Sequence, residues 1–151
     1  WTTTPWTLVS NTAVAVNPKI EYQVIEVTNE EKTERLVVAT NLAAVLGEER
    51  KVLATFTGAE LENTKYVAPF DLVEIPDAHY IVLADYVTVE DGTGLVHQSP
   101  AFGADDFAVC RKYGLPIVNP IAPDGHFLPE LNLIGAEKPR NHEGIGLPLY
   151  C

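Results

Sequence analysis

The chain of 151 residues contains no methionine and only two cysteines, Cys110 and Cys151. Because a natural reading frame begins with methionine, its absence leads us to expect a single domain, residues 1–151, excised from a larger protein. The cysteines lie outside any C-x-x-C pair, so they indicate neither a disulfide framework nor a zinc site. Sparse, unpaired cysteines favour a reducing compartment, and we expect the protein in the cytoplasm.

Long apolar runs and positive charges are also scarce. No run approaches the ~18 to 20 apolar residues of a membrane-spanning helix, so no contact with a membrane is expected. Ten Lys and Arg stand against 21 Asp and Glu, which gives a net charge of −11. Since an acidic chain gains little from counterion release, a nucleic-acid partner must make a few local contacts or be held by other domains.

The sequence pattern consists of short β-prone runs separated by turn residues, with two short helical segments. This arrangement predicts a mainly β fold with some α, either a β-barrel or a sandwich with appended helices. Residues from about 135 onward show no periodicity and are expected to form a surface tail. The expected strands are residues 12–16, 20–27, 35–39, 51–57, 80–89, 95–97 and 117–118, and the expected helices are residues 42–46 and 104–113.

Familiar catalytic and metal-binding motifs are missing. The two serines, Ser10 and Ser99, lie outside a G-x-S-x-G elbow, which argues against a serine hydrolase. The four histidines lack H-E-x-x-H or a comparable spacing, so no metal site is predicted. Cys110 falls on the core-facing side of an expected helix, where a free cysteine is commonly a small apolar residue.

Two segments of unusual composition remain, WTTTPWT at residues 1–7 and GTGLVHQSPAFGADDF at residues 92–107. Each residue has an ordinary structural explanation: threonines on an edge strand, His97 as a hydrogen-bonded core side chain, and acids at a helix start. These explanations do not account for the concentration of hydroxyls, one imidazole and one spare carboxylate at strand ends. Such a set suits a pocket that binds a cation and hydroxyl groups.

These segments, with Asn11 after the first, resemble the editing domain inserted into isoleucyl-tRNA synthetase, a class I aminoacyl-tRNA synthetase. The related valyl and leucyl enzymes carry arginine for the third threonine and an acid for the second tryptophan, so Thr4 and Trp6 fit the isoleucyl type. The resemblance covers about residues 1–127, and residues 135–151 form a divergent tail. It implies a closed β-barrel core with short flanking helices.

The resemblance also implies an activity, the hydrolytic proofreading of tRNA(Ile) mischarged with valine, of valyl-adenylate, or of both. Valine fits the site and isoleucine is excluded by size. The implied partners are the 3′ end of tRNA(Ile) carrying valine, valyl-adenylate and the rest of the synthetase, in a protein expected to be monomeric. Because the H-I-G-H and K-M-S-K-S signatures are absent, ATP, Mg²⁺ and any Zn²⁺ belong to that remainder, and no cofactor is expected here.

The catalytic residues implied by the resemblance are Thr2, Thr3, Thr4 and Asp106. The carboxylate of Asp106 is expected to pair with the α-ammonium of the misattached valine, a charge-assisted contact. Its neighbour Asp105 is then the residue that caps the helix. The three threonines are expected to hydrogen-bond the terminal adenosine, the ester or the attacking water.

The residues implied to bind substrate are Trp6, Thr7, Asn11 and His97, together with Asp106. Asn11 supports the threonines, and the other three wall the pocket for the amino-acid side chain. His97 is placed to collide with a substrate larger than valine. No residue is an obvious strong base, so we expect a positioned water and oxyanion stabilisation, without a covalent intermediate or a metal.

Two alternatives stay open. One is a non-catalytic barrel that binds an aminoacyl or nucleoside ligand, which the divergent tail favours. The other is an unrelated interaction module with its threonines on an edge strand. The module would be favoured if Thr3, His97 and Asp106 lay far apart in the fold.

Overall fold

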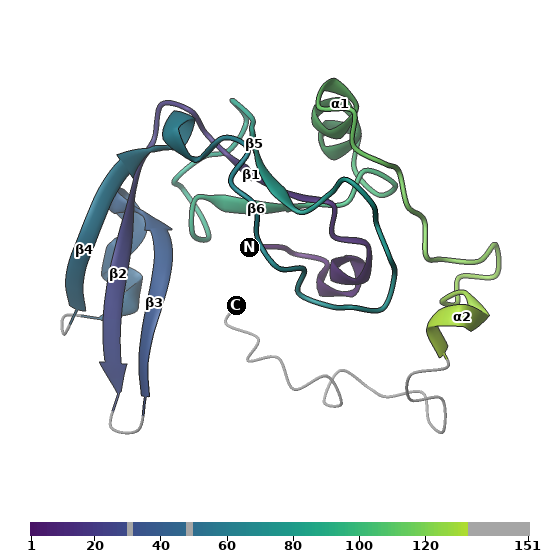
Figure 1. Ribbon diagram of the computed structural model, residues 1–151, viewed down its shortest axis with the longest axis horizontal. Coiled ribbons are helices and arrows are strands. Elements are labelled where there is room, and N and C mark those ends of the chain that lie inside the picture. Colours follow the sequence, from purple (N-terminus) through teal and green to yellow (C-terminus); the bar gives the residue numbers. More distant parts are fainter. Residues whose placement is uncertain (30–31, 48–49, 133–151) are drawn as a thin grey trace.

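The structure is a computed structural model that describes residues 1–29, 32–47 and 50–132. Its strands form two three-stranded sheets, and short helices connect them (Figure 1). In the described residues, no helix is both long and apolar enough to cross a membrane. The helices are η1 (Pro5–Ser10), η2 (Thr40–Leu46), η3 (Gly58–Leu61), α1 (Ala104–Lys112) and α2 (Pro129–Asn132).

The first sheet has β1 (Ala13–Val16) at its centre. This strand is parallel to β5 (Tyr80–Leu83) on one side and antiparallel to β6 (Leu95–Gln98) on the other. Ala13 and Ala15 of β1 are fully buried in a core to which helix α1 contributes. The buried residues of this core are Ala13, Ala15, Val82, Ala84, Val87, Cys110 and Leu115.

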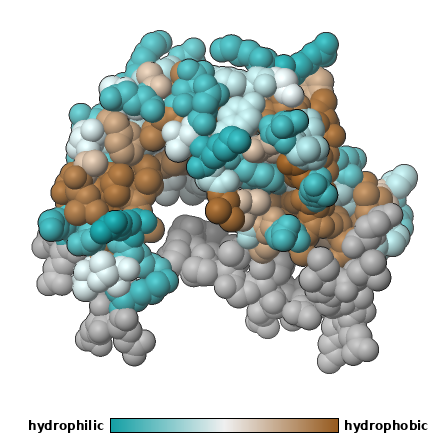
Figure 2. All heavy atoms as spheres, in the orientation of Figure 1, coloured by the Kyte–Doolittle hydropathy of each residue, from teal (hydrophilic) through white to brown (hydrophobic). Residues whose placement is uncertain are grey.

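The second sheet is antiparallel, in the order β3 (Lys32–Ala39), β2 (Glu21–Asn29) and β4 (Arg50–Thr57). Helix η2 packs against one of its faces through a small core of Ile25, Val38 and Ala43. Large apolar side chains elsewhere on the sheet stay exposed, and Figure 2 shows hydrophobic residues on this side of the molecule. The exposed ones are Leu36, Val37, Val52 and Leu53.

Tyr22 of β2 joins the two sheets. Its hydroxyl donates to the carbonyl of Gly94 at 2.7 Å and accepts the N–H of Asn17 at 3.0 Å, and its ring is fully buried. Gly94 has a φ of +77°, and a Cβ there would lie 2.5 Å from the Cβ of Ala39. Only glycine therefore fits this turn without displacing the second sheet.

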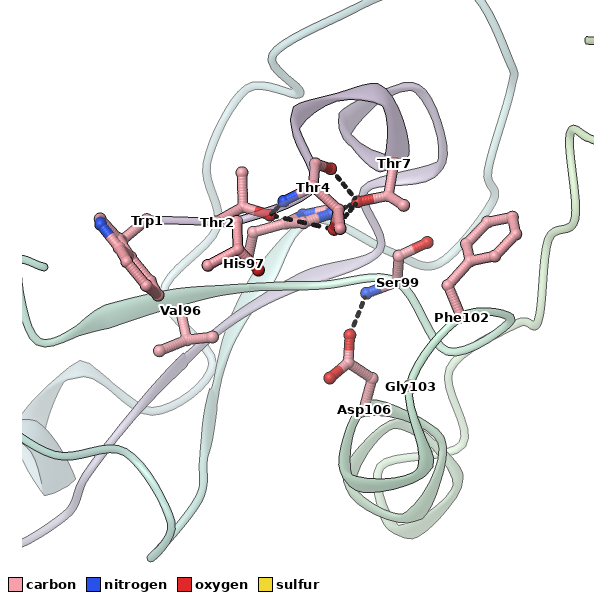
Figure 3. Close-up of a pocket in the computed structure, with 11 residues that line it drawn as sticks. Trp1, Thr2, Thr4, Thr7, Val96, His97, Ser99, Phe102, Gly103 and Asp106 are labelled. Carbon is pink, nitrogen blue, oxygen red and sulfur yellow. Dashed lines mark hydrogen bonds between the residues drawn. The ribbon is translucent and has the colours of Figure 1, made fainter. Parts of the chain in front are cut away.

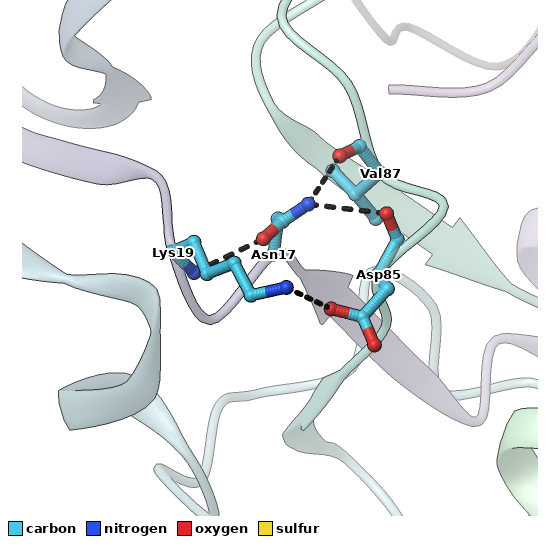
Figure 4. A network of polar contacts seen from close by, with 4 residues as sticks. All are labelled: Asn17, Lys19, Asp85 and Val87. Carbon is cyan, nitrogen blue, oxygen red and sulfur yellow. Dashed lines mark hydrogen bonds and ion pairs between the residues drawn. The ribbon is translucent and has the colours of Figure 1, made fainter.

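Asn17 fixes the connection between β1 and β2 (Figure 4). Its amide nitrogen donates to the carbonyls of Asp85 at 3.2 Å and Val87 at 2.9 Å, and its Oδ1 accepts the N–H of Lys19 at 3.0 Å. The ion pair of Lys19 with Asp85 is exposed on both sides, so it adds little stability. The amide of Asn17 thus ties the start of the second sheet to the loop after β5.

The mainly β character predicted from the sequence is confirmed, but the closed barrel is wrong for the described residues, whose strands form two separate sheets. One reason is that the strand expected at residues 80–89 ends at Leu83. The chain turns immediately afterwards, where the N–H of Val87 donates to the carbonyl of Ala84 at 3.3 Å. The strand expected at residues 117–118 is irregular, and the tail at 135–151 lies outside the described residues.

Candidate functional site

A pocket of about 270 Å³ opens between the first residues of the chain, β6 and the loop that leads into α1 (Figure 3). Both segments singled out in the sequence contribute to it, so their predicted convergence on one cleft is confirmed. Thr3, His97 and Asp106 share this pocket, which removes the observation that would have favoured an unrelated module. The lining residues are Trp1, Thr2, Thr3, Thr4, Thr7, Val96, His97, Ser99, Phe102, Gly103 and Asp106.

The opening segment is a helical turn rather than an edge strand. Pro5 is the first residue of η1, a position that suits its fixed φ and missing N–H. The turn is closed by Thr7, whose N–H and hydroxyl donate to the carbonyl of Thr4 at 3.0 and 2.7 Å. The N–H of Thr4 donates to the hydroxyl of Thr2 at 3.1 Å. The hydroxyls of Thr2 and Thr7 are therefore held in one orientation, and Thr3 and Thr4 remain exposed at the pocket.

His97 is buried, with 8% of its surface exposed, and both of its ring nitrogens are engaged. The side-chain amide of Asn11 donates to Nδ1 at 2.7 Å, so the ring proton is on Nε2, which faces the hydroxyl of Thr7 at 2.9 Å. Burial lowers the pKa of His97 to about 4, so the ring is neutral at physiological pH. A neutral ring held at both nitrogens is a fixed wall.

Asn11 lies behind the pocket rather than in its lining. Its amide nitrogen donates to His97 and to the carbonyl of Ala13 at 3.1 Å, and its Oδ1 accepts the hydroxyl of Tyr66 at 2.5 Å. Sequence reasoning missed Tyr66, because it lies in a loop 55 residues from Asn11 with no motif around it. The predicted support role of Asn11 is directed at His97 in the structure.

Asp106 projects from the first turn of α1 toward the end of β6 (Figure 3). Its Oδ2 accepts the backbone N–H of Ser99 at 2.8 Å, and burial raises the pKa of the carboxyl above its ordinary value. Helix α1 begins after Gly103, which has no side chain to form a cap, and Asp105 is exposed. The predicted capping by Asp105 is therefore wrong: no side chain caps this helix.

Gly103 leaves room for the carboxylate of Asp106. A Cβ at Gly103 would lie 2.9 Å from Oδ1 and 3.0 Å from Cγ of that side chain. Its φ of −141° and ψ of 138° are open to any residue, so the constraint comes from space and not from the backbone. No pattern in the sequence around Gly103 predicts this requirement.

The aromatic residues that line the pocket are Trp1 and Phe102 rather than Trp6. The ring of Trp6 is 42% exposed and packs edge-on against Phe102, with 4.9 Å between ring centres. Trp6 therefore supports the wall from outside. Some lining residues had no predicted role, but all of them lie within the two segments singled out in the sequence. They are Trp1, Val96, Ser99, Phe102 and Gly103.

The two serines connect the two segments. The hydroxyl of Ser10 donates to the carbonyl of Thr7 at 3.1 Å and lies 2.7 Å from the hydroxyl of Ser99, and both residues are buried. Because the single proton of Ser10 is used on Thr7, Ser99 is the donor between the two hydroxyls. Within the described residues no group of three His, Cys, Asp or Glu side chains could hold a metal ion.

Comparisons with known proteins identify the family of this chain. Residues 1–145 match the family model described as "Leucyl-tRNA synthetase, editing domain". The chain is 59% identical over 140 residues to an isoleucine–tRNA ligase of Thermobifida fusca and 61% identical over 138 residues to one of Streptomyces coelicolor. The matches cover 91% and 89% of this chain but only 13% of each ligase.

A solved structure with a similar fold is described as the crystal structure of GlLeuRS-CP1. The TM-score is 0.57 at 22% sequence identity, and the match covers 81% of this chain and 52% of that one. At this identity the likeness shows the fold alone. With the family match over residues 1–145, the chain belongs to the aminoacyl-tRNA synthetase editing domains, and its resemblance to the editing domain of isoleucyl-tRNA synthetase is confirmed.

Proposed function

We propose that this pocket hydrolyses valine misattached to tRNA(Ile), or held as valyl-adenylate, and rejects isoleucine. The observation that carries the proposal is the half-buried carboxylate of Asp106, which shares its pocket with threonine hydroxyls and with no lysine or arginine. A buried carboxylate without a cationic side chain favours binding of a cation from outside. The α-ammonium of an aminoacyl ester supplies that charge and forms a charge-assisted hydrogen bond.

The buried ring of His97 supports selection by size. The ring lines the pocket of about 270 Å³ and is held at both nitrogens, so this wall does not move aside for a longer side chain. A hydrophobic pocket separates substrates that differ by one methylene by only about 10- to 200-fold, for which isoleucyl-tRNA synthetase is itself the standard example. A second site that admits valine and excludes isoleucine multiplies this discrimination.

The chemistry expected here depends on positioning rather than on a strong base. His97 is neutral and both of its nitrogens are used, so it is not available to accept a proton from water. An aminoacyl ester is already activated: water adds to its carbonyl carbon, the bond to the ribose oxygen breaks, and that oxygen takes the proton. The hydroxyls of Thr3 and Thr4 are exposed at the pocket and are suited to orient the water and stabilise the oxyanion.

The remaining partners follow from the charge and length of the chain. At −11 it is unsuited to hold tRNA by itself, so the rest of the ligase is expected to bind the tRNA body while the 3′ end enters the pocket. The monomeric state and the cytoplasmic location expected from the sequence stay predictions.

The test compares neighbouring acids in the full-length ligase, with Val-tRNA(Ile) and Ile-tRNA(Ile) as substrates. Asp106→Ala removes the contact to the ammonium and should slow release of valine by about 10- to 150-fold, the equivalent of a charged hydrogen bond. Asp105→Ala is the matched control, because this residue is exposed and outside the pocket, and it should leave the rate unchanged. Normal deacylation by Asp106→Ala would overturn the assignment.

The same substrates separate hydrolysis from binding alone. A non-hydrolysable valyl-adenosine analogue that binds the parent ligase, with no release of valine from tRNA, would indicate the non-catalytic alternative. Release of isoleucine as fast as valine would contradict selection by size.

A further inference from the structure

We infer that Tyr66, which lies outside the pocket, is a positioning residue for it: its hydroxyl orients the amide of Asn11 and thereby the ring of His97. Tyr66 is in the loop before β5, whereas His97 is on β6. The positioning follows from hydrogen-bond geometry alone. Its consequence for selectivity rests on the proposed function.

The amide of Asn11 has one orientation that satisfies all of its neighbours. Its Oδ1 accepts from the hydroxyl of Tyr66 at 2.5 Å, while its nitrogen donates to the carbonyl of Ala13 at 3.1 Å and to Nδ1 of His97 at 2.7 Å. Turning the amide over would set Oδ1 against the carbonyl oxygen of Ala13, and two acceptors repel. The phenol is suited to its role because burial raises the pKa of Tyr66, so it stays protonated and donates.

Orientation of this amide determines the tautomer of His97. With Nδ1 accepting from Asn11, the ring proton is on Nε2 and is donated to the hydroxyl of Thr7 at 2.9 Å. The hydroxyl of Thr7 in turn donates a hydrogen bond to the carbonyl of Thr4 at 2.7 Å. The hydrogen bonds therefore run in one direction, from Tyr66 through to the threonine turn, and His97 is pinned at both nitrogens.

Tyr66 is itself held in place by His79. Its N–H donates to the carbonyl of His79 at 2.9 Å, and the two rings meet edge-on with 5.8 Å between their centres. Nε2 of His79 donates to the backbone carbonyl of Asn11 at 3.0 Å. Asn11 is thus fixed through its side chain by one residue and through its backbone by the other, which leaves the wall of the pocket little freedom to move.

The direct test records ¹⁵N signals of labelled histidine in the 151-residue chain. In the parent, Nδ1 of His97 should be unprotonated and Nε2 protonated. Tyr66→Phe keeps the ring but removes the donor, so only the carbonyl of Ala13 and the ring of His97 still hold the amide, and a fraction of the molecules should carry the proton on Nδ1. Tyr80→Phe is the matched control, because its hydroxyl donates to the carbonyl of Tyr113 at 3.1 Å, outside this set of hydrogen bonds, and it should leave the signals unchanged.

A second variant keeps the inference testable if Tyr66→Phe does not fold. Asn11→Asp retains an acceptor for Tyr66 but offers His97 only a carboxylate, so the proton should move to Nδ1 and the two nitrogen signals should exchange. Parent-like signals in folded Tyr66→Phe, or an unchanged tautomer in Asn11→Asp, would overturn the positioning role.

The consequence for selectivity is measured in the full-length ligase. A loosened ring should admit the longer side chain, so Tyr66→Phe should lower the ratio of valine to isoleucine release by up to about tenfold. Tyr80→Phe should keep the parent ratio. A shifted tautomer with an unchanged ratio would contradict the selectivity role alone. If the parent ligase releases neither amino acid, the proposed function fails while the ¹⁵N signals still decide the role of Tyr66.

Discussion

The two sheets of this chain differ in what they bury. At one end of the first sheet polar side chains are packed inside the protein, and in the described residues no buried side-chain nitrogen or oxygen lacks a hydrogen bond. The second sheet has the opposite character, because apolar side chains of its strands remain on the surface (Figure 2). The buried polar residues are Thr7, Ser10, Asn11, Thr12, His97, Gln98 and Ser99.

The difference indicates where the fold requires a unique arrangement. A buried polar group that loses its partner destabilises the protein by about 1 to 3 kcal/mol, so a fully satisfied set permits one geometry. An exposed apolar side chain needs no particular partner, so it does not restrict the geometry around it. The pocket is built on the first kind of region, and substitutions there should have larger effects than substitutions on the second sheet.

The largest effect should appear as a pH dependence centred on His97. Its pKa is about 4 in the folded chain against an ordinary 6.5, so the unfolded state binds more protons between these values. The free energy of unfolding should therefore be highest above pH 6.5 and fall by up to about 3 kcal/mol as the pH drops to 4. Urea denaturation at a series of pH values measures this slope.

Replacing the imidazole separates the contribution of His97 to this slope from the contributions of other titratable groups. His97→Gln should flatten the slope between pH 6.5 and 4. Asp106 contributes to the slope with the opposite sign. Burial raises the pKa of its carboxyl in the folded state, so its contribution to the free energy of unfolding falls as the pH rises. An unchanged slope in His97→Gln would show that the pH dependence arises elsewhere.

A loss of activity with little loss of stability is expected at Gly103. Gly103→Ala would bring a Cβ to 2.9 Å from Oδ1 of Asp106, so the carboxylate must move away from the N–H of Ser99. Valine release by the full-length ligase should fall about tenfold, or about 1.4 kcal/mol. Stability should change by less than about 1 kcal/mol, since the backbone angles suit alanine. Full activity would show that the carboxylate has another equally good position.

The sequence predicted the two segments of the site because their composition is unusual, but it could not predict what holds them. Tyr66 and Ser10 contact the site from ordinary surroundings, and their partners are 55 and 89 residues away. Hydrogen bonds over such separations depend on tertiary packing and leave no local pattern. Steric room, as at Gly103, likewise depends on a neighbouring side chain.

The fold shows the same division between local and non-local information. The strand at β2 and the helix at α1 follow from local patterning and turn residues, and both predictions are confirmed. The run at residues 80–89 has the composition of one long strand, yet it ends at Leu83 because Asn17 binds the turn that follows. Whether a barrel closes depends on such distant contacts, so composition alone could not decide between a closed barrel and two separate sheets.

Unequal losses of stability are expected from the two buried serines, Ser10 and Ser99. Ser99→Ala removes the donor to Ser10 but leaves the proton of Ser10 on Thr7, so the loss of stability should be about 1 kcal/mol. Ser10→Ala leaves the hydroxyl of Ser99 buried without its acceptor and should cost more, up to about 3 kcal/mol. Thermal unfolding of both variants and of the double variant measures this order. Equal losses in the two single variants would contradict the assigned direction.

The smallest effect should come from the exposed face of the second sheet, tested on adjacent residues of β3. Val37 is 40% exposed and Val38 only 1%, so Val37→Thr should change the free energy of unfolding by less than about 0.5 kcal/mol. Val38→Thr places a hydroxyl in the core with Ile25 and Ala43 and should lower it by about 1 to 3 kcal/mol. Urea denaturation of the two variants measures the difference. Equal destabilisation would mean that this face is covered in solution, and the contrast between the two sheets would then disappear.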